Sequence, residues 1–155
     1  MRAALYNGQK SIEMTELPTP KAGENDIVVK NIYASICGTD VAVYEHGPGT
    51  GHRITVGSEF GHEMVSEVVQ VGKNVKDIKL GDRVYHIPTC KGRFKACRND
   101  RWIFRICTDP NAELGKGVYA VPDEISSKEA SLIEPFTVGC RAARRSFQGR
   151  EKMQL

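Results

Sequence analysis

The chain has 155 residues, of which 40% are hydrophobic and 26% are charged, and its formal net charge is +3. This length suits one domain, since domains usually have about 100 to 200 residues. The small net charge does not argue for nucleic acid as a partner. Neither a signal peptide nor an apolar run long enough to cross a bilayer is found, so we expect no membrane contact and a cytoplasmic location. The odd number of cysteines, five, favours thiols and metal ligands over a disulfide framework.

Short segments with β propensity and turns between them make up most of the chain. Strands are expected at residues 1–6, 11–17, 26–33, 64–71 and 83–87. Asn7 and Gly8 separate the first two and indicate a hairpin, because both residues tolerate positive φ. The glycine-rich run 47–51 is interpreted as a loop. Regularly broken short strands are typical of a barrel or a sandwich, so we predict a mostly β domain.

One helix is predicted near the C-terminal end. Ser126 and Glu129 have the spacing of a capping box, and apolar residues follow at helical intervals. Pro135 is expected to bend or break this helix near Glu134. The arginines at its end suit the negative pole of the helix dipole, and we interpret them as a solvated helix end; they are Arg141, Arg144 and Arg145.

Two short motifs carry the residues of a metal site. They are Cys37-Gly38-Thr39-Asp40 and Gly61-His62-Glu63. A thiolate, an imidazole and a carboxylate can hold zinc and leave a fourth position open, as in catalytic zinc sites. Cys37 and His62 are far apart in the sequence, whereas structural zinc fingers use closely spaced pairs. We therefore predict a catalytic zinc site that the fold assembles.

With these motifs the chain resembles the zinc-dependent medium-chain alcohol dehydrogenases, in particular the polyol and threonine dehydrogenase branch. The resemblance runs from Met1 to about Phe147, except that residues 88–110 depart from the family pattern. Its most specific parts are Ile36-Cys37-Gly38-Thr39-Asp40, Gly61-His62-Glu63, Glu67-Val68-Val69, Val71-Gly72, Gly81-Asp82-Arg83-Val84 and Glu134-Pro135-Phe136.

The resemblance implies a GroES-like, partly open β-barrel with a few short helices and one C-terminal helix over residues 1–147. In the family a Rossmann domain follows, and residues 148–155 would be the tail where it begins. A dinucleotide-binding unit needs a strand, a glycine-rich turn and a helix within about 30 residues. Only 21 residues follow Glu134, without a Gly-x-Gly-x-x-Gly motif. We expect the Rossmann domain to be absent and NAD(P) not to bind this chain alone.

A ligand set also follows from the resemblance. Cys37 and His62 would bind zinc, and Glu63 would be either the third ligand or a carboxylate behind the ligands. Glu134 occupies the family position of a residue that can also serve as the third zinc ligand. We therefore expect the two glutamates to share or exchange this role. Asp40 is expected to accept the second N–H of His62, since ligating histidines normally donate to a carboxylate or carbonyl.

The activity that the resemblance implies is reversible oxidation of a small alcohol or polyol, with hydride passing to NAD(P). Thr39 would relay the substrate proton; the alternative for this threonine is a turn hydrogen bond. Some relatives carry a histidine at the position of Ala42, for which His46 or water could substitute. The expected catalytic residues are therefore Thr39, Asp40 and Glu63.

Residues 88–110 correspond to the structural zinc lobe of the family, which has the pattern C-x2-C-x2-C-x7-C. Only Cys90, Cys97 and Cys107 are present, at longer spacings, so we do not expect a structural zinc, although Asp100 could serve as a fourth ligand. Basic residues surround Phe94 and Trp102 in the same stretch. A solvated basic loop is preferred here over a nucleic-acid platform.

Taken together, the sequence predicts the zinc-binding catalytic domain of an alcohol or polyol dehydrogenase that does not turn over alone. A non-catalytic zinc-binding module and a partner-dependent subunit remain as alternatives. The surface that faces a Rossmann domain in the family would be exposed and apolar. We expect it to be covered by a separate chain with a cofactor domain, or by self-association through the exposed cleft face.

Overall fold

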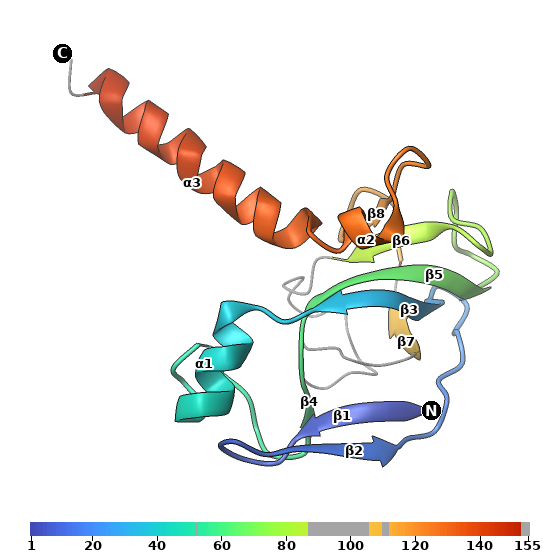
Figure 1. The fold of residues 1–155 in the computed structure, drawn as a ribbon. Helices are drawn as coiled ribbons and strands as arrows, with labels where there is room; N and C mark the ends of the chain where they lie inside the picture. Colours follow the sequence, from blue (N-terminus) through green and yellow to red (C-terminus); the bar gives the residue numbers. More distant parts are fainter. Residues whose placement is uncertain (52, 87–105, 110–111, 153–155) are drawn as a thin grey trace.

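The computed structural model describes residues 1–51, 53–86, 106–109 and 112–152. These residues form two β-sheets, two short helices and one long helix (Figure 1). No helix within this part of the chain is long and apolar enough to cross a membrane. The expectations for a structural zinc and for a basic platform fall almost entirely on residues 87–105 and 110–111, which lie outside the described residues.

The smaller sheet has the strand order β2-β1-β4. Strands β1 (Arg2–Tyr6) and β2 (Ile12–Glu16) form the predicted antiparallel hairpin, and the two-residue strand β4 (Ser58–Glu59) pairs with the other edge of β1. The turn is closed by a hydrogen bond of 2.9 Å from Asn7 N to Ser11 O, and Gly8 adopts a φ of 108° there. The hairpin prediction is confirmed.

The larger sheet is fully antiparallel, with the order β7-β3-β5-β6-β8. Its strands are β3 (Ile27–Ser35), β5 (Glu63–Val71), β6 (Arg83–His86), β7 (Ile106–Asp109) and β8 (Val118–Ala120). The predicted strands at 26–33, 64–71 and 83–87 are thus confirmed within a few residues, whereas β7 and β8 were not predicted. The ladder between β3 and β5 is the longest pairing and contains two register shifts.

Apolar side chains from both sheets meet in the main core. Ile27, Val28 and Val29 at the start of β3 have no exposed surface. The main core cluster consists of Ala3, Ile27, Val29, Met64, Val68, Ile78, Val84, Ala112 and Val118. Two packed sheets without a closed barrel in the described part of the chain confirm the mostly β, partly open architecture.

Three helices complete the fold. Helix α1 (Gly38–His46), which the sequence did not predict, follows β3. Helix α2 (Ser127–Ala130) has the predicted capping box, with Glu129 N donating to Ser126 Oγ at 3.2 Å and Ser126 N donating to the Glu129 carboxylate at 2.8 Å. The expected break comes at residues 131–132, so Pro135 lies in the first turn of α3 (Ile133–Lys152). Proline is tolerated there because the N–H groups of a first turn have no partner within the helix.

Helix α3 extends away from the two sheets, and it continues past residue 147, where the sequence suggested that the domain ends (Figure 1). Its described side chains from Pro135 onward are exposed, including Phe136 at 72% and Phe147 at 68%. Burial of an apolar face normally supplies most of a helix's stability in a protein. This helix therefore presents apolar side chains that its own domain does not cover.

The buried start of β3 gives a direct test of the fold. Replacing Ile27, which is 0% exposed, by alanine should lower the free energy of unfolding by about 2–5 kcal/mol, because a cavity replaces packed methylene groups. Leu80→Ala is the matched control, since Leu80 is 67% exposed, and should change stability by about 0.5 kcal/mol or less. Urea unfolding followed by circular dichroism measures both. Equal effects of the two substitutions would contradict the assigned core.

Candidate metal centre

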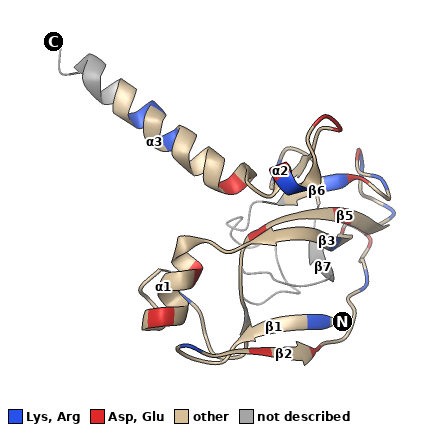
Figure 2. Cartoon of the chain, in the orientation of Figure 1, with Lys and Arg blue, Asp and Glu red and all other residues tan. Residues whose placement is uncertain are grey.

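The predicted metal ligands lie where three elements meet. The ladder of the larger sheet places Ser35, the last residue of β3, opposite Glu63, the first residue of β5. Cys37 follows at the N-terminus of α1. Gly61 adopts a φ of 89°, a conformation that favours glycine, and His62 follows it directly. Figure 2 shows acidic residues at the positions where α1, β5 and α3 begin.

Cys37, His62 and Glu63 form a group whose candidate ligand atoms all lie within 4.8 Å of one another. Glu63 is 3% exposed, and Cys37 and His62 are half-buried. A buried carboxylate beside a thiol and an imidazole is an unfavourable arrangement without a compensating positive charge. The donor types are those of catalytic zinc sites, so the residues present fit a zinc ion.

Asp40 connects two members of this group. Its carboxylate is fully buried; Oδ2 accepts the Cys37 N–H at 3.1 Å, and Oδ1 lies 3.1 Å from His62 Nδ1. The hydrogen bond to Asp40 raises the pKa of His62, burial of the ring opposes this, and the charge of Asp40 adds to the increase. Because Nδ1 has this partner, Nε2 is the ring nitrogen that would face a metal, as expected for a ligating histidine. The contact predicted from the sequence is present, and its role in metal binding stays a prediction.

Glu134 lies beside the group rather than within it. It is in the first turn of α3, and its carboxyl group shares a hydrogen bond with Glu63. Burial raises the pKa of Glu134, the hydrogen bond and the charge of Glu63 raise it further, and His62 opposes the shift. One carboxyl of such a pair holds a proton readily, because two adjacent carboxylates repel each other. The structure thus brings both glutamates together, while their sharing of a ligand role stays a prediction.

Thr39 is exposed in the first turn of α1, two residues after Cys37. The loop that follows α1 folds back on this turn, where the Thr50 hydroxyl donates to the Ala42 carbonyl at 2.9 Å. Gly51 approaches the Thr39 backbone so closely that a Cβ at position 51 would collide with it. The interpretation of residues 47–51 as a loop is therefore right, and the loop supports the first turn of α1.

Two residues beside the site were not singled out as functional by the sequence. Arg83 on β6 donates to the carbonyls of Pro122 and Ile125 at 2.9 and 2.8 Å, and to the Ser127 hydroxyl at 3.2 Å. It therefore holds the segment that leads into α2. Tyr85 is 6% exposed, and its burial, together with the charges of Glu134 and Glu63, raises the pKa of its hydroxyl. The contacts of Arg83 join residues 39 to 44 positions apart, so no local pattern could have indicated them.

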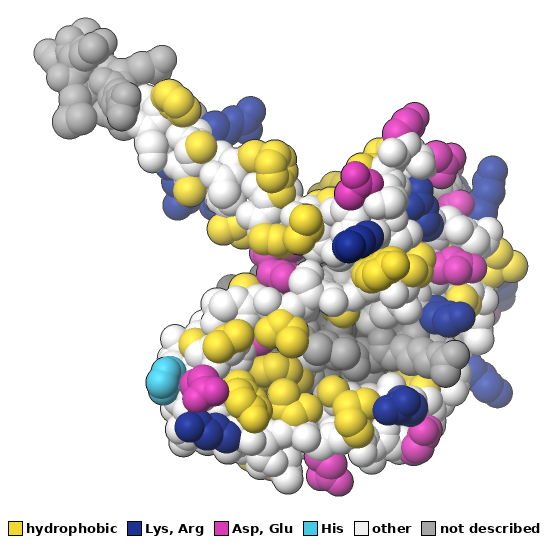
Figure 3. Space-filling model, in the orientation of Figure 1, with side chains coloured by type: hydrophobic (Ala, Val, Ile, Leu, Met, Phe, Trp, Pro, Cys, Tyr) yellow, Lys and Arg dark blue, Asp and Glu magenta, His cyan; other side chains and the backbone are white. Residues whose placement is uncertain are grey.

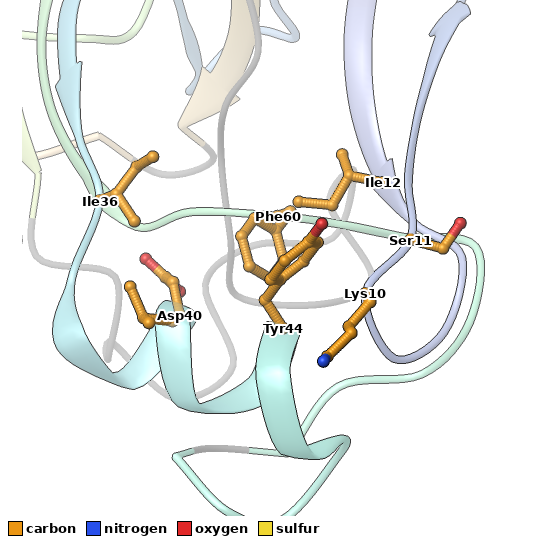
Figure 4. Close-up of a pocket in the computed structure, with 8 residues that line it drawn as sticks. Lys10, Ser11, Ile12, Ile36, Asp40, Tyr44 and Phe60 are labelled. Atoms are coloured by element: carbon orange, nitrogen blue, oxygen red, sulfur yellow. The ribbon is translucent and has the colours of Figure 1, made fainter.

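A cavity of about 480 Å³ opens between α1 and the β1–β2 hairpin (Figure 4). Its lining is mostly apolar and consists of Lys10, Ser11, Ile12, Ile36, Asp40, Val41, Tyr44 and Phe60. Figure 3 shows hydrophobic side chains gathered on the face of the molecule where α1 and the hairpin lie. Asp40 and Ile36 place this cavity next to the candidate metal centre.

Residues 23–131 match the family described as "Alcohol dehydrogenase GroES-like domain". The match covers more than half of the chain, and the chain therefore belongs to this family. The sorbitol dehydrogenase of Bacillus subtilis (strain 168) is 32% identical over 163 residues, which cover 94% of this chain and 45% of the relative. The L-threonine 3-dehydrogenase of Salmonella gallinarum is 36% identical over 141 residues, covering 83% of this chain and 41% of the relative.

Solved structures support the same assignment. The 2R,3R-butanediol dehydrogenase of Bacillus subtilis superimposes with a TM-score of 0.67 at 26% identity, covering 86% of this chain and 44% of that chain. A zinc-binding dehydrogenase from Clostridium scindens, described as putative, gives a TM-score of 0.74 at 23% identity, which shows the fold alone. It covers 93% of this chain and 47% of that chain. The chain therefore spans less than half the length of each of these relatives.

Removing the Asp40 carboxylate should destabilise the fold around the site even without metal. Asp40→Ala removes the acceptor of the Cys37 N–H and the hydrogen-bond partner of His62 Nδ1, a loss of about 1–3 kcal/mol in the free energy of unfolding. Thr39→Ala, at an exposed neighbouring position, should change it by about 0.5 kcal/mol or less. Denaturant unfolding in the presence of a chelator measures both, and an unchanged Asp40→Ala variant would contradict the linking role of this carboxylate.

Proposed function

We propose that this chain is the zinc-binding catalytic domain of an alcohol or polyol dehydrogenase. The observation that supports the proposal is the group formed by Cys37, His62 and Glu63, with Asp40 hydrogen-bonded to two of its members. The named relatives, a sorbitol and a threonine dehydrogenase, support an alcohol group as the reacting centre. The family assignment and the donor types agree on zinc as the metal.

Zinc bound by Cys37, His62 and Glu63 would supply a Lewis acid that polarises the alcohol oxygen and lowers the pKa of the hydroxyl group. Asp40 would keep the proton on His62 Nδ1 and thereby fix the ring orientation and the tautomer. Glu134 would balance the charge of Glu63 by sharing a proton with it, and would join it as a second, exchangeable carboxylate ligand.

Thr39 is proposed to pass the substrate proton towards solvent. Its hydroxyl belongs to an exposed side chain in the first turn of α1, two residues from the proposed thiolate ligand. The neighbouring cavity of about 480 Å³ lies within the size range of small-molecule pockets. A small alcohol or polyol substrate is consistent with this volume.

The cofactor is proposed to bind outside these 155 residues. The described segments contain no strand, glycine-rich turn and helix in the order that dinucleotide binding requires. Exposed apolar side chains near the candidate centre support a covering partner; they include Ile36, Val41, Leu132, Phe136 and Val138. A chain with a cofactor domain and a second copy of this chain are both proposed as candidates for that partner.

The metal prediction can be tested on the purified chain. We expect one zinc per chain by mass spectrometry, and loss of this zinc in Cys37→Ser, because the site would then lose its thiolate. Cys140→Ser is the matched control, since Cys140 is an exposed thiol on α3 away from the group, and should retain the metal. Zinc retained in Cys37→Ser and lost on changing Cys90 or Cys97 would refute the proposed centre.

Turnover provides an independent test. We expect no change in absorbance at the wavelength of the reduced nicotinamide when the zinc-loaded chain is mixed with NAD(P) and small alcohols such as sorbitol, threonine or butanediol. The reason is that no described segment has the strand, glycine-rich turn and helix with which a Rossmann unit holds the dinucleotide. The proposal would be refuted if reduced nicotinamide formed in proportion to the concentration of the chain and did not form with Cys37→Ser. The cofactor would then bind within these 155 residues.

A further inference from the structure

Three separate segments carry the ionisable groups of the candidate centre. Cys37 follows β3, Glu63 begins β5, and Glu134 lies in the first turn of α3. The ladder between β3 and β5 fixes the first two segments, because Ser35 pairs with Glu63. None of the described strands pairs with the segment that carries Glu134, and the side chains of α3 from Pro135 to Phe147 are exposed. The position of Glu134 therefore depends on what holds the junction between α2 and α3.

Ser35 makes a direct connection to that junction. Its Oγ donates to the carbonyl oxygen of Ser131 at 3.0 Å, across 96 positions of sequence. Ser131 ends α2 and lies three residues before Glu134. Its own N–H donates to the Ser127 carbonyl at 3.2 Å and its hydroxyl to the Lys128 carbonyl at 2.7 Å, so the acceptor belongs to an ordered turn.

Other contacts of this region that the structure describes involve β5 and β6. Arg83 holds residues 122–127, ahead of the junction. Ile133 packs against a cluster of buried residues that includes Val65 and Tyr85. Both anchor the junction to β5 and β6, whereas the Ser35 hydroxyl ties it to β3, the strand that leads to Cys37.

We propose that Ser35 is a positioning residue. It holds the Glu134 carboxyl group against Glu63 and at a fixed place relative to Cys37, and this inference rests on the proposed zinc site. One hydroxyl then couples the two glutamates to the thiolate: Ser35 pairs with Glu63 through the backbone and with the Glu134 segment through its side chain. Loss of the hydroxyl leaves the Ser131 carbonyl without this donor and frees the first turn of α3 to move away from Glu63.

The first test follows metal affinity in five variants, by competition with a chromophoric chelator for Zn²⁺ and by the visible spectrum of Co²⁺. Ser35→Ala should weaken Zn²⁺ binding by about 10-fold, the lower end of what residues behind the ligands contribute. Ser35→Thr, which keeps the hydroxyl, should restore wild-type affinity. Ser131→Ala is the matched control, since it keeps the accepting carbonyl and should bind Zn²⁺ like the wild type.

The comparison of Glu134→Gln with the Ser35→Ala/Glu134→Gln double variant distinguishes a positioning role from a general disturbance of the fold. In a Glu134→Gln background, Ser35→Ala should change Zn²⁺ affinity by about twofold or less, because residues that act through one another are not additive. An undiminished effect of Ser35→Ala in that background would overturn the proposal, since Ser35 would then act through Cys37 or the fold rather than through Glu134.

Amide hydrogen exchange on the metal-free chain separates this proposal from the proposed function. Ser35→Ala should speed exchange in the first turns of α3, where Phe136 N donates to the Leu132 carbonyl, and leave the β1–β2 hairpin unchanged. Faster exchange in a chain that binds no Zn²⁺ would refute the zinc site and keep the positioning contact. Unchanged exchange in α3 would refute the positioning contact, whatever the metal result.

Discussion

A single buried carboxylate holds the candidate centre together. Asp40 has no exposed surface, and an ionised group in such a place must be compensated by hydrogen bonds or by charge. It accepts the N–H of Cys37 at the start of α1, where the helix dipole also favours a negative charge, and it pairs with His62. The start of a helix and the residue that precedes β5 are thereby fixed to each other. The position of the Cys37 backbone and the orientation of the imidazole both depend on this one group.

The two glutamates of the site are supported in different ways. Glu63 lies on the central strand of a five-stranded sheet and is almost fully buried. Glu134 lies in the first turn of a helix that leaves the domain, and among the described residues this turn is held through the α2–α3 junction rather than by strand pairing. A carboxylate on a central strand keeps its position, whereas one on a loosely held helix end can approach or withdraw at low cost. This difference suits a centre in which one carboxylate is permanent and the other is exchangeable.

The sequence predicts the fold well where its signals are local. The Asn7-Gly8 turn and the capping box of Ser126 are confirmed because each involves residues within four positions of one another. The grouping of Cys37, His62 and Glu63 was found through motif resemblance, although these residues come from two elements. Helix α1 was missed because Cys37 is not among the usual N-cap residues and the helix shows little segregation of apolar residues. The contacts of Arg83 and Ser35 span distant elements, so only the fold reveals them.

The two register shifts in the ladder between β3 and β5 cancel each other. Val69 has no partner on β3 and Ile32 has none on β5, so one unpaired residue on each strand restores the original alignment before Ser35 meets Glu63. Each of these unpaired residues is the extra residue of a β-bulge, which bends its strand without changing the pairs on either side. Losing Ile32 or Val69 alone would therefore straighten the strand and leave Ser35 opposite Glu63. These two positions are where β3 and β5 can each shorten by one residue without moving the end of the ladder that carries the candidate centre.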